Sequence, residues 1–565
     1  TQQARAALNN VVINKTGGTL SLKDKISVKG NWIYQQGNLD ARTNLSTLIL
    51  RDGNRVFSGN HFLYNLTLLG YDVNDPSTSE IPEHDTITVE GEFKIDGGNG
   101  AYLNTGTINA TGSIRSSSIA TANTGGTATI NICGELDQSL SGQYNGAGRF
   151  CNIKINKPSG TLNLSGNITV GASNWNYVKG IVNPGTSRVV FWGNGTVNTA
   201  NGASSMDFYH FEIQNGSVTM LSPIIARKDF KTWGSTTLTT NSHDIFVGGY
   251  FQNGGVFSLG TTTITFNGTG RQDEYTSTNT NYHKVVINKP SGNVFVDGVF
   301  VISNNLSLVK GALVPRSSST GHYVRILDNA TTTGGSNTSF IMCGVMKMGD
   351  DAFTFPMGDT TLADSAKYHP FTLPAPASSA TYTVRYYPKN PLTDYPTYTT
   401  IQSPLQSIST AEYFYVESGP ALTPTLSWNT NNSNVNALAE IRVASWNGTQ
   451  WVNLGNASTT GNLTKGSITA ASASTSAYDK YFVIGNINDI HLDPVATFQN
   501  SGGTCVGKTI TFSNTSLHAS SYQWKVNNAN VSTATNLTYT FNTIGTYTIT
   551  LVASNGTVTD TKNAN

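Results

Sequence analysis

Short runs of alternating apolar and polar residues repeat along the first half of the chain, and each run ends at Gly, Asn or Ser. One phrase, NIKINKPSG at 152–160, returns nearly unchanged as KVVINKPSG at 284–292 and more loosely as VVINKTGG at 11–18. Alternation with a period of two, broken by turn residues, indicates a strand, a turn and another strand. The phrase therefore predicts a repeated structural unit.

The repeated unit contains three short strands. Its copies are anchored on the apolar residue that closes each phrase: Ile13, Leu68, Ile155, Ile213 and Ile287. A second alternating run follows each anchor, and an apolar run such as VVFWGNGT at 189–196 then leads into a Gly-rich turn. Strands this short cannot bury a core alone, so they are expected to stack on the equivalent strands of the next unit.

Such stacking favours an irregular parallel β-helix over residues 1–337, with apolar ladders inside and Asn and Gly at the corners. Coils of roughly 20 to 25 residues, about 4.8 Å apart, would make a rod on the order of 65 to 80 Å long. A sandwich of Greek-key sheets is the competing layout. The composition, with 12% charged residues and 56 Gly, also indicates an all-β protein.

Two further segments follow the repeats. Longer strands such as TYTVRYYP at 381–388, separated by Pro-rich or polar loops, predict a β-sandwich connector over residues 338–488. Residues 489–565 predict a short immunoglobulin-like sandwich with Trp524 on a central strand.

The last segment resembles a PKD domain (polycystic kidney disease type) of bacterial surface proteins. The resemblance lies in CVGKTITFSNTS, the YQW before Lys525 and the run YTFNTIGTYTITLV at 539–552. Members of that family usually carry Trp-Asp-Phe-Gly-Asp-Gly, whereas this chain has WKVNNA at 524–529.

The preceding segment resembles a β-rich module of Bacteroidota surface proteins that are cargo for the type IX secretion route. The matching runs are MKMGDDAFTFPMGD at 346–359, AEYFYVES at 411–418 and RVASWNGTQWVNLGN at 442–456, although a Trp common near Phe414 is absent. Together the two resemblances imply a large secreted adhesin, filament or gliding-motility-associated protein on the cell surface.

The charge balance restricts the partners. Lys and Arg number 34 against 33 Asp and Glu, so nothing attracts nucleic acid or an anionic membrane. The sequence contains no run of about 18 apolar residues, so it predicts no membrane span. The expected partners are surface glycans, other cell-surface proteins, and other copies or flanking repeats of the same long chain, of which this sequence is expected to be a fragment.

Motifs of known chemistry are scarce. The nine His residues show no metal-ligand spacing, there is no Gly-x-Ser-x-Gly elbow, and the Gly-rich stretches lie between strands. We therefore expect a non-enzymatic structural or adhesive protein without a cofactor. The alternative is a polysaccharide-binding or polysaccharide-cleaving β-helix. Carboxylates or aromatics aligned across successive coils would favour that alternative, and a face of Thr, Asn and Ser would favour a stalk.

One acidic insertion is a candidate calcium site. The stretch YDVNDPSTSEIPEHD at 71–85 offers the carboxylates of Asp72, Asp75 and Glu80, and Ca²⁺ prefers such oxygen ligands. A solvated loop without a cation is the alternative reading.

Two cysteines are candidates for a disulfide. In the alignment of the repeats Cys133 and Cys151 lie about one coil apart, which suits the Cα separation of bridged cysteines. Cys343 and Cys505 have no obvious partner in the sequence.

Thr86 and Ser365 are candidate glycosylation sites. The tripeptides DTI at 85–87 and DSA at 364–366 resemble the Asp-Ser/Thr-apolar acceptor of Bacteroidota O-glycosylation, and both lie in loop-like sequence.

Two tryptophans mark a predicted hairpin. Trp446 and Trp451 flank the turn residues Asn447 and Gly448, so both rings should lie near the hairpin tip. They either pack on the sandwich or form a platform for a ligand.

Overall fold

The computed structural model describes residues 7–70, 77–98, 101–121, 125–277, 280–417, 420–429, 435, 437–474, 480–488, 494–502, 506–556 and 558–565. It is 56% strand and 1% helix, which confirms the all-β prediction. Within these ranges the helix is the single turn α1 (Pro391–Asp394). The chain divides into two compact units, Thr1–Pro370 with Pro374–Arg385, and Phe371–Leu373 with Tyr386–Asn565.

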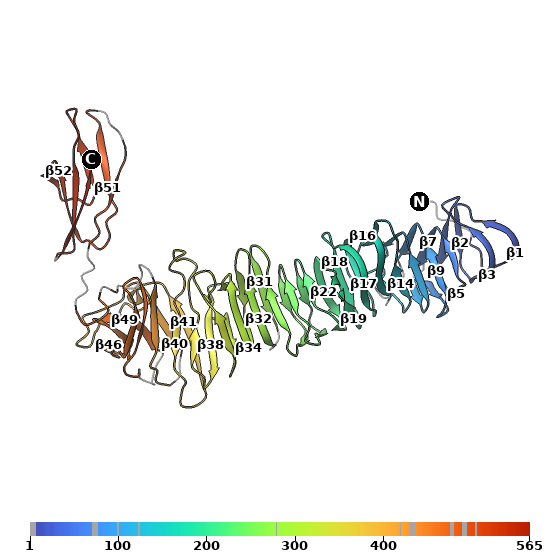
Figure 1. Cartoon of the computed structure of the whole chain (residues 1–565), viewed down its shortest axis with the longest axis horizontal. Helices are drawn as coiled ribbons and strands as arrows, with labels where there is room; N and C mark the ends of the chain where they lie inside the picture. Colours follow the sequence, from blue (N-terminus) through green and yellow to red (C-terminus); the bar gives the residue numbers. More distant parts are fainter. Residues whose placement is uncertain are drawn as a thin grey trace. The chain divides into compact units, whose positions relative to one another are not determined.

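The first unit is a parallel β-solenoid of about 15 turns, as predicted, and not a Greek-key sandwich. Its strands follow one another in chain order from β1 to β38 (Figure 1). Each turn contributes strands to up to three stacks, within which neighbours pair in parallel.

The opening turns form two of these stacks. One contains β1 (Val11–Ser21), β3 (Trp32–Asp40), β5 (Asn54–Ser58), β8 (Ser77–Glu80) and β11 (Ala101–Asn104). The other contains β2 (Lys25–Val28), β4 (Thr47–Arg51), β7 (Asn65–Gly70), β10 (Glu92–Gly97), β13 (Ser113–Ser116) and β15 (Gln138–Gly142).

A third stack, here called the polar stack, runs through the middle of the solenoid. After β6 (His61–Leu63) it contains β9 (Thr86–Val89), β12 (Thr107–Ala110), β14 (Thr129–Ile132), β16 (Asn152–Val170), β17 (Trp175–Asn183), β19 (Gly195–Asn198), β23 (Ser217–Met220), β26 (Thr237–Thr239) and β29 (Val256–Ser258).

Two more stacks complete the later turns. The aromatic stack contains β18 (Arg188–Trp192), β22 (His210–Asn215), β25 (Phe230–Thr232), β28 (Phe251–Asn253), β31 (Gln272–Thr276), β33 (Val294–Asp297) and β35 (Leu313–Pro315). The last stack contains β24 (Ile224–Ala226), β27 (Ile245–Val247), β30 (Thr263–Phe266), β32 (Asn281–Asn288), β34 (Val299–Lys310), β36 (Tyr323–Ile326) and β38 (Gly344–Gly349).

Apolar ladders fill the solenoid, because alternation sends every second side chain inward and parallel pairing in register places like residues above one another. Phe211, Phe230 and Phe251 stack with ring centroids 5.1 and 5.8 Å apart. All three are fully buried. The next residue in this ladder is Glu274, which is also fully buried.

The Asn-Lys-Pro-Ser-Gly phrase holds a corner together. Lys157 is buried, and its Nζ donates to the carbonyl oxygens of Gly134 and Leu136 on the preceding coil at 2.7 and 2.8 Å. It also donates to Gln138 Oε1 at 2.8 Å. The lysine that recurs in the repeat is therefore architectural, since it satisfies carbonyl groups that the turn leaves without partners.

Residue 337 is the predicted end of the β-helix. Parallel pairing continues past it, because β36 pairs in parallel with β38. The direction then changes, because residues 380–384 of β41 (Ala380–Tyr387) pair antiparallel with β38.

The second unit contains mixed sheets that confirm the sandwich-like prediction. One sheet contains β43 (Tyr413–Glu417), β49 (Lys480–Asn486), β45 (Ile441–Trp446) and β46 (Trp451–Asn453), with β42 (Ser407–Ile408) beside β49. The other contains β40 (Phe371–Leu373), β44 (Thr425–Asn429), β48 (Lys465–Thr469) and β47 (Ser458–Gly461). Phe371 joins them, with its ring 5.2 Å from Phe414 and 5.8 Å from Phe482.

The final segment has two small antiparallel sheets. They consist of β50 (Phe498–Asn500), β51 (Thr509–Asn514) and β54 (Leu537–Thr540), and of β53 (Ala529–Ser532), β52 (Ser521–Val526), β55 (Ile549–Ser554) and β56 (Thr559–Ala564). Trp524 is fully buried in their common core, and its Nε1 donates to Ala534 O at 3.0 Å.

Candidate functional site

Aromatic and ionic side chains line up across four successive coils on the outer side of the aromatic stack. We call this surface the aromatic face. Its first column is Asp229, Tyr250, Asp273 and Phe295, and its second column, two residues later on each strand, is Lys231, Gln252, Tyr275 and Asp297. All eight side chains are partly exposed. A period of two residues within each strand and register between strands produce the two columns.

Trp233 extends the aromatic face beyond the end of β25. Its backbone N–H donates to Ile213 O at 3.0 Å, so pairing with β22 continues to this residue. Its side chain is 44% exposed, which is unusual for a ring of this size.

Ion pairs and a cation–π contact involve side chains of the aromatic face. Lys231 Nζ lies 3.1 Å from Asp229 Oδ2, and Arg271 contacts Asp273 at 2.5 Å. The Arg271 guanidinium also lies 3.8 Å from the centre of the Phe295 ring. These contacts hold the rings and charges in fixed positions, which is the preorganisation a binding surface needs.

Electrostatics keep Asp229 ionised. Burial alone would raise the pKa of Asp229, but the His210 ring, whose Nδ1 lies 3.2 Å from Asp229 Oδ2, the hydrogen bond from the Tyr250 N–H and the charge of Lys231 hold that pKa well below its usual range. A carboxylate of this kind accepts hydrogen bonds and is poorly suited to donate a proton.

The polar stack presents a different outer surface. Its outward column over nine coils is Thr86, Thr107, Thr129, Asn152, Asn174, Thr196, Thr219, Thr239 and Ser258. Side chains within it bond to the next coil, as when Thr196 Oγ1 donates to Asn174 Oδ1 at 2.9 Å, 22 residues earlier. Both surfaces that the sequence proposed as alternatives are therefore present, on different stacks.

The candidate calcium ligands are only partly described. Asp72 and Asp75 lie outside the described residues. Glu80 is the exposed last residue of β8, and its Oε1 accepts a hydrogen bond from Thr105 Oγ1 at 2.8 Å. The calcium site stays a prediction.

A different acidic cluster was missed in the sequence. Carboxylate oxygens of Asp328, Asp350 and Asp351 lie within 4.8 Å of one another. Asp351 Oδ2 accepts from Lys347 Nζ at 2.8 Å and from the Asn329 N–H at 2.9 Å. These two donors stabilise the Asp351 carboxylate, and Lys347 offsets its charge. The adjacent aspartates in MGDD were the available signal.

The predicted disulfide is not formed, because Cys133 and Cys151 are free thiols. β14 pairs with β16 so that Thr129 faces Asn152. Cys133 follows that paired segment and Cys151 precedes it, which separates them by about 16 Å along the strand direction. This distance exceeds the reach of a disulfide. Burial raises the pKa of the Cys151 thiol to about 12.

Of the other two cysteines, Cys343 alone lies within the described residues. Cys343 is a buried free thiol whose pKa burial raises to about 12, so it is protonated at neutral pH. Cys505 lies outside the described residues.

The two candidate glycosylation sites have different surroundings. Thr86 begins strand β9 and is half-buried, and not in a loop as its sequence suggested; its N–H donates to Asn60 Oδ1 at 2.6 Å. Ser365 lies exposed in a turn, as expected for an acceptor. Glycan attachment at either residue stays a prediction.

Trp446 and Trp451 face each other across the β45–β46 hairpin, as predicted, but both rings are buried. Trp446 stacks on Tyr398 with centroids 4.0 Å apart. Trp451 Nε1 donates to Tyr398 O at 2.7 Å. The structure therefore contradicts the ligand-platform hypothesis and supports a packing role.

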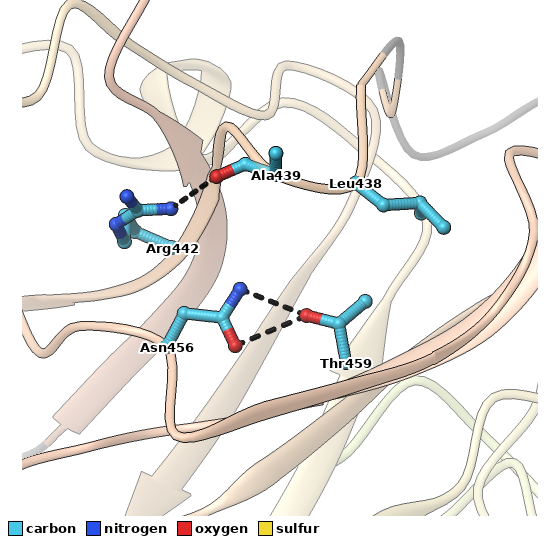
Figure 2. Close-up of a pocket in the computed structure, with 5 residues that line it drawn as sticks. All are labelled: Leu438, Ala439, Arg442, Asn456 and Thr459. Carbon is cyan, nitrogen blue, oxygen red and sulfur yellow. Dashed lines mark hydrogen bonds between the residues drawn. The ribbon is translucent and has the colours of Figure 1, made fainter.

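A polar pocket of about 480 Å³ lies in the second unit (Figure 2). Leu438, Ala439, Arg442, Asn456 and Thr459 line it. Arg442 Nη1 donates to Ala439 O at 2.8 Å, and the Asn456 amide bonds to Thr459 Oγ1 at 2.8 and 3.0 Å. Among the described residues, its lining contains no carboxylate, His or Cys.

No protein-family model matches this chain, and no curated protein matches it in sequence. Among the described residues no helix is long and apolar enough to cross a membrane. The resemblances to a PKD domain and to type IX cargo stay predictions.

Proposed function

We propose that this chain is a non-enzymatic extracellular surface protein, a fragment of a long adhesin or cell-surface filament that holds surface glycans. The aromatic face carries the proposal, because its rings and paired charges are in register over four coils. Aromatic rings supply apolar contact to the C–H faces of sugars, and the fixed ionic groups offer hydrogen bonds to hydroxyl groups.

The polar stack supports the structural part of the proposal. Thr and Asn columns bonded from coil to coil suit a stalk that is solvated along its length, and contacts limited to neighbouring coils let such a stalk grow by repetition. Other copies or flanking repeats of the same chain are the partners this arrangement would accept.

The carboxyl groups support a binding role over cleavage. Glycoside hydrolysis needs one carboxylic acid with a raised pKa beside the substrate. Among the described carboxyl groups, Glu274 has a clearly raised pKa, but it is buried inside the solenoid. Asp229 on the aromatic face has a lowered pKa.

The test is binding of the full chain to a panel of immobilised polysaccharides. Wild type should bind, the double variant Tyr250→Ala, Tyr275→Ala should bind at least tenfold more weakly, and a Thr196→Ala, Thr219→Ala control on the polar stack should match wild type. Equal binding by the Tyr250, Tyr275 variant would contradict the proposal. Release of reducing or unsaturated sugar ends by wild type would show an enzyme instead.

A further inference from the structure

A basic pocket of about 460 Å³ adjoins the aromatic face in the first unit. We call it the lysine pocket, because Lys289, Lys310 and Lys367 line it together with one acid, Asp364. Three ammonium groups against one carboxylate leave a net charge of about +2 at neutral pH.

Lys289 occupies the place in its repeat that Lys157 occupies in the earlier one. Both are buried, and Lys289 Nζ donates to Gly268 O at 2.9 Å and to Gln272 Oε1 at 2.5 Å. Lys157 makes three such bonds and Lys289 makes two among the described residues. An ammonium group has three donors. Lys289 is fully buried, so its ammonium group adds fixed positive charge beneath the lysine pocket, and direct contact with a ligand falls to the exposed Lys310.

Lys310 and Lys367 supply the other two positive charges of the lysine pocket. Lys367 pairs with Asp364 at 2.6 Å, which neutralises one of the positive charges. Lys310 lies on the coil after that of Lys289, whose backbone N–H donates to Lys310 O at 2.9 Å. It forms no ion pair within the described part of the chain. Two cations thus lack a counter-charge, the buried Lys289 and the exposed Lys310.

Apolar contacts join the lysine pocket to the aromatic face. Ala312 and Phe340 line the pocket, and Phe295, at the end of the first column, packs against the hydrophobic cluster that contains them. A ligand in the pocket therefore has the Phe295 ring of the aromatic face beside it.

We propose that the lysine pocket binds the carboxylate or sulfate group of an acidic polysaccharide whose neighbouring sugar units lie on the aromatic face. Anionic oxygens make charge-assisted hydrogen bonds to ammonium groups, and these are stronger than bonds to neutral donors. Asn293 and Asp364 at the pocket supply groups that can bond to ring hydroxyls. This inference rests on the proposed glycan-binding function and names its ligand class.

The test measures dissociation constants of the full chain by calorimetry for three probes: a polyuronate, a sulfated glucan and the unmodified neutral glucan. Lys310→Gln should weaken binding of at least one acidic probe about five- to tenfold and leave the neutral glucan unchanged. Lys284→Gln, which removes an exposed lysine of β32 outside the pocket, is the matched control and should match wild type.

The outcomes separate the two proposals. Unchanged acidic binding by Lys310→Gln, with wild type binding glycans, would overturn the lysine pocket and leave the proposed function standing. No binding of any glycan by wild type would overturn both. Inorganic sulfate should compete poorly, and competition by free sulfate at the same concentration of sulfate groups would show a simple anion site instead of a polysaccharide site.

Discussion

Glu274 has an environment that an ionised carboxyl group disfavours, because its side chain is fully buried. It stands in a ladder position between Phe251 and Val296, and burial raises its pKa to about 8. Thr276 Oγ1 donates to its carboxyl group, and Tyr282 bonds to the same hydroxyl at 2.7 Å. A carboxyl group in this setting is protonated at neutral pH.

Glu274 therefore makes stability depend on pH. The unfolded chain loses this proton near pH 4.5 and the folded chain near pH 8, so the free energy of unfolding falls as pH rises through that window. The loss approaches about 3 kcal/mol near pH 7. Glu274→Gln should remove that part of the slope and be the more stable protein at pH 8.

Urea unfolding at pH 5, 6.5 and 8, followed by circular dichroism, measures the effect. Asp273→Asn is the matched control, because Asp273 lies next to Glu274 but points outward to Arg271. A slope that Glu274→Gln leaves unchanged would show that the carboxyl group is ionised inside the solenoid.

At the scale of strands and corners, the buried Lys157 should be among the costly residues to replace. Lys157→Met removes three hydrogen bonds and leaves the carbonyls of Gly134 and Leu136 without partners. We expect a loss of about 3 kcal/mol in the free energy of unfolding. Lys154→Met, on the outer side of the same strand, should cost little, and equal losses for the two variants would contradict the corner role.

The β45–β46 hairpin of the second unit also contains a residue that should be costly to replace. Trp451 is fully buried and bonded to Tyr398 O, so Trp451→Ala should cost about 3 to 5 kcal/mol. Trp451→Phe keeps most of the ring and should cost less than half as much. Intrinsic fluorescence during unfolding measures both. Near-wild-type stability of Trp451→Ala would return the ring to the list of candidate ligand contacts.

Alternation allowed the coils to be predicted, because inward and outward positions differ by one residue in a strand. The alignment of one coil with the next could not be predicted in the same way, because the number of residues per coil varies. Equivalent residues are 22 apart at Thr196 but 19 apart at Thr261, so the sequence does not show which outward residues become neighbours. Tyr250 and Tyr275 were missed for this reason.

The same limit explains the wrong disulfide. A repeat alignment places Cys133 and Cys151 one coil apart, but whether they face each other depends on register along the strand, which the pairing of Thr129 with Asn152 decides. The burial of Trp446 and Trp451 was equally hidden, because their partner Tyr398 lies far away in the chain.

For the whole molecule, the two parts of the proposed glycan site should respond differently to salt. The charges of the aromatic face are paired, whereas the lysine pocket carries two cations without a counter-charge. Because the screening length falls from about 10 Å at 0.1 M salt to about 3 Å at 1 M, acidic glycans should bind severalfold more weakly across that range. The neutral glucan should be little affected.

Two variants then separate the contributions. Lys310→Gln should reduce the dependence of the acidic-glycan affinity on salt, whereas Trp233→Ala should weaken acidic and neutral glycans alike and leave the dependence unchanged, because Trp233 contributes ring contact and no charge. Dissociation constants at four sodium chloride concentrations supply the slopes. An identical slope for wild type and Lys310→Gln would place the ionic contact elsewhere on the protein, and a salt-dependent neutral glucan would mean that the aromatic face works through its ion pairs instead of its rings.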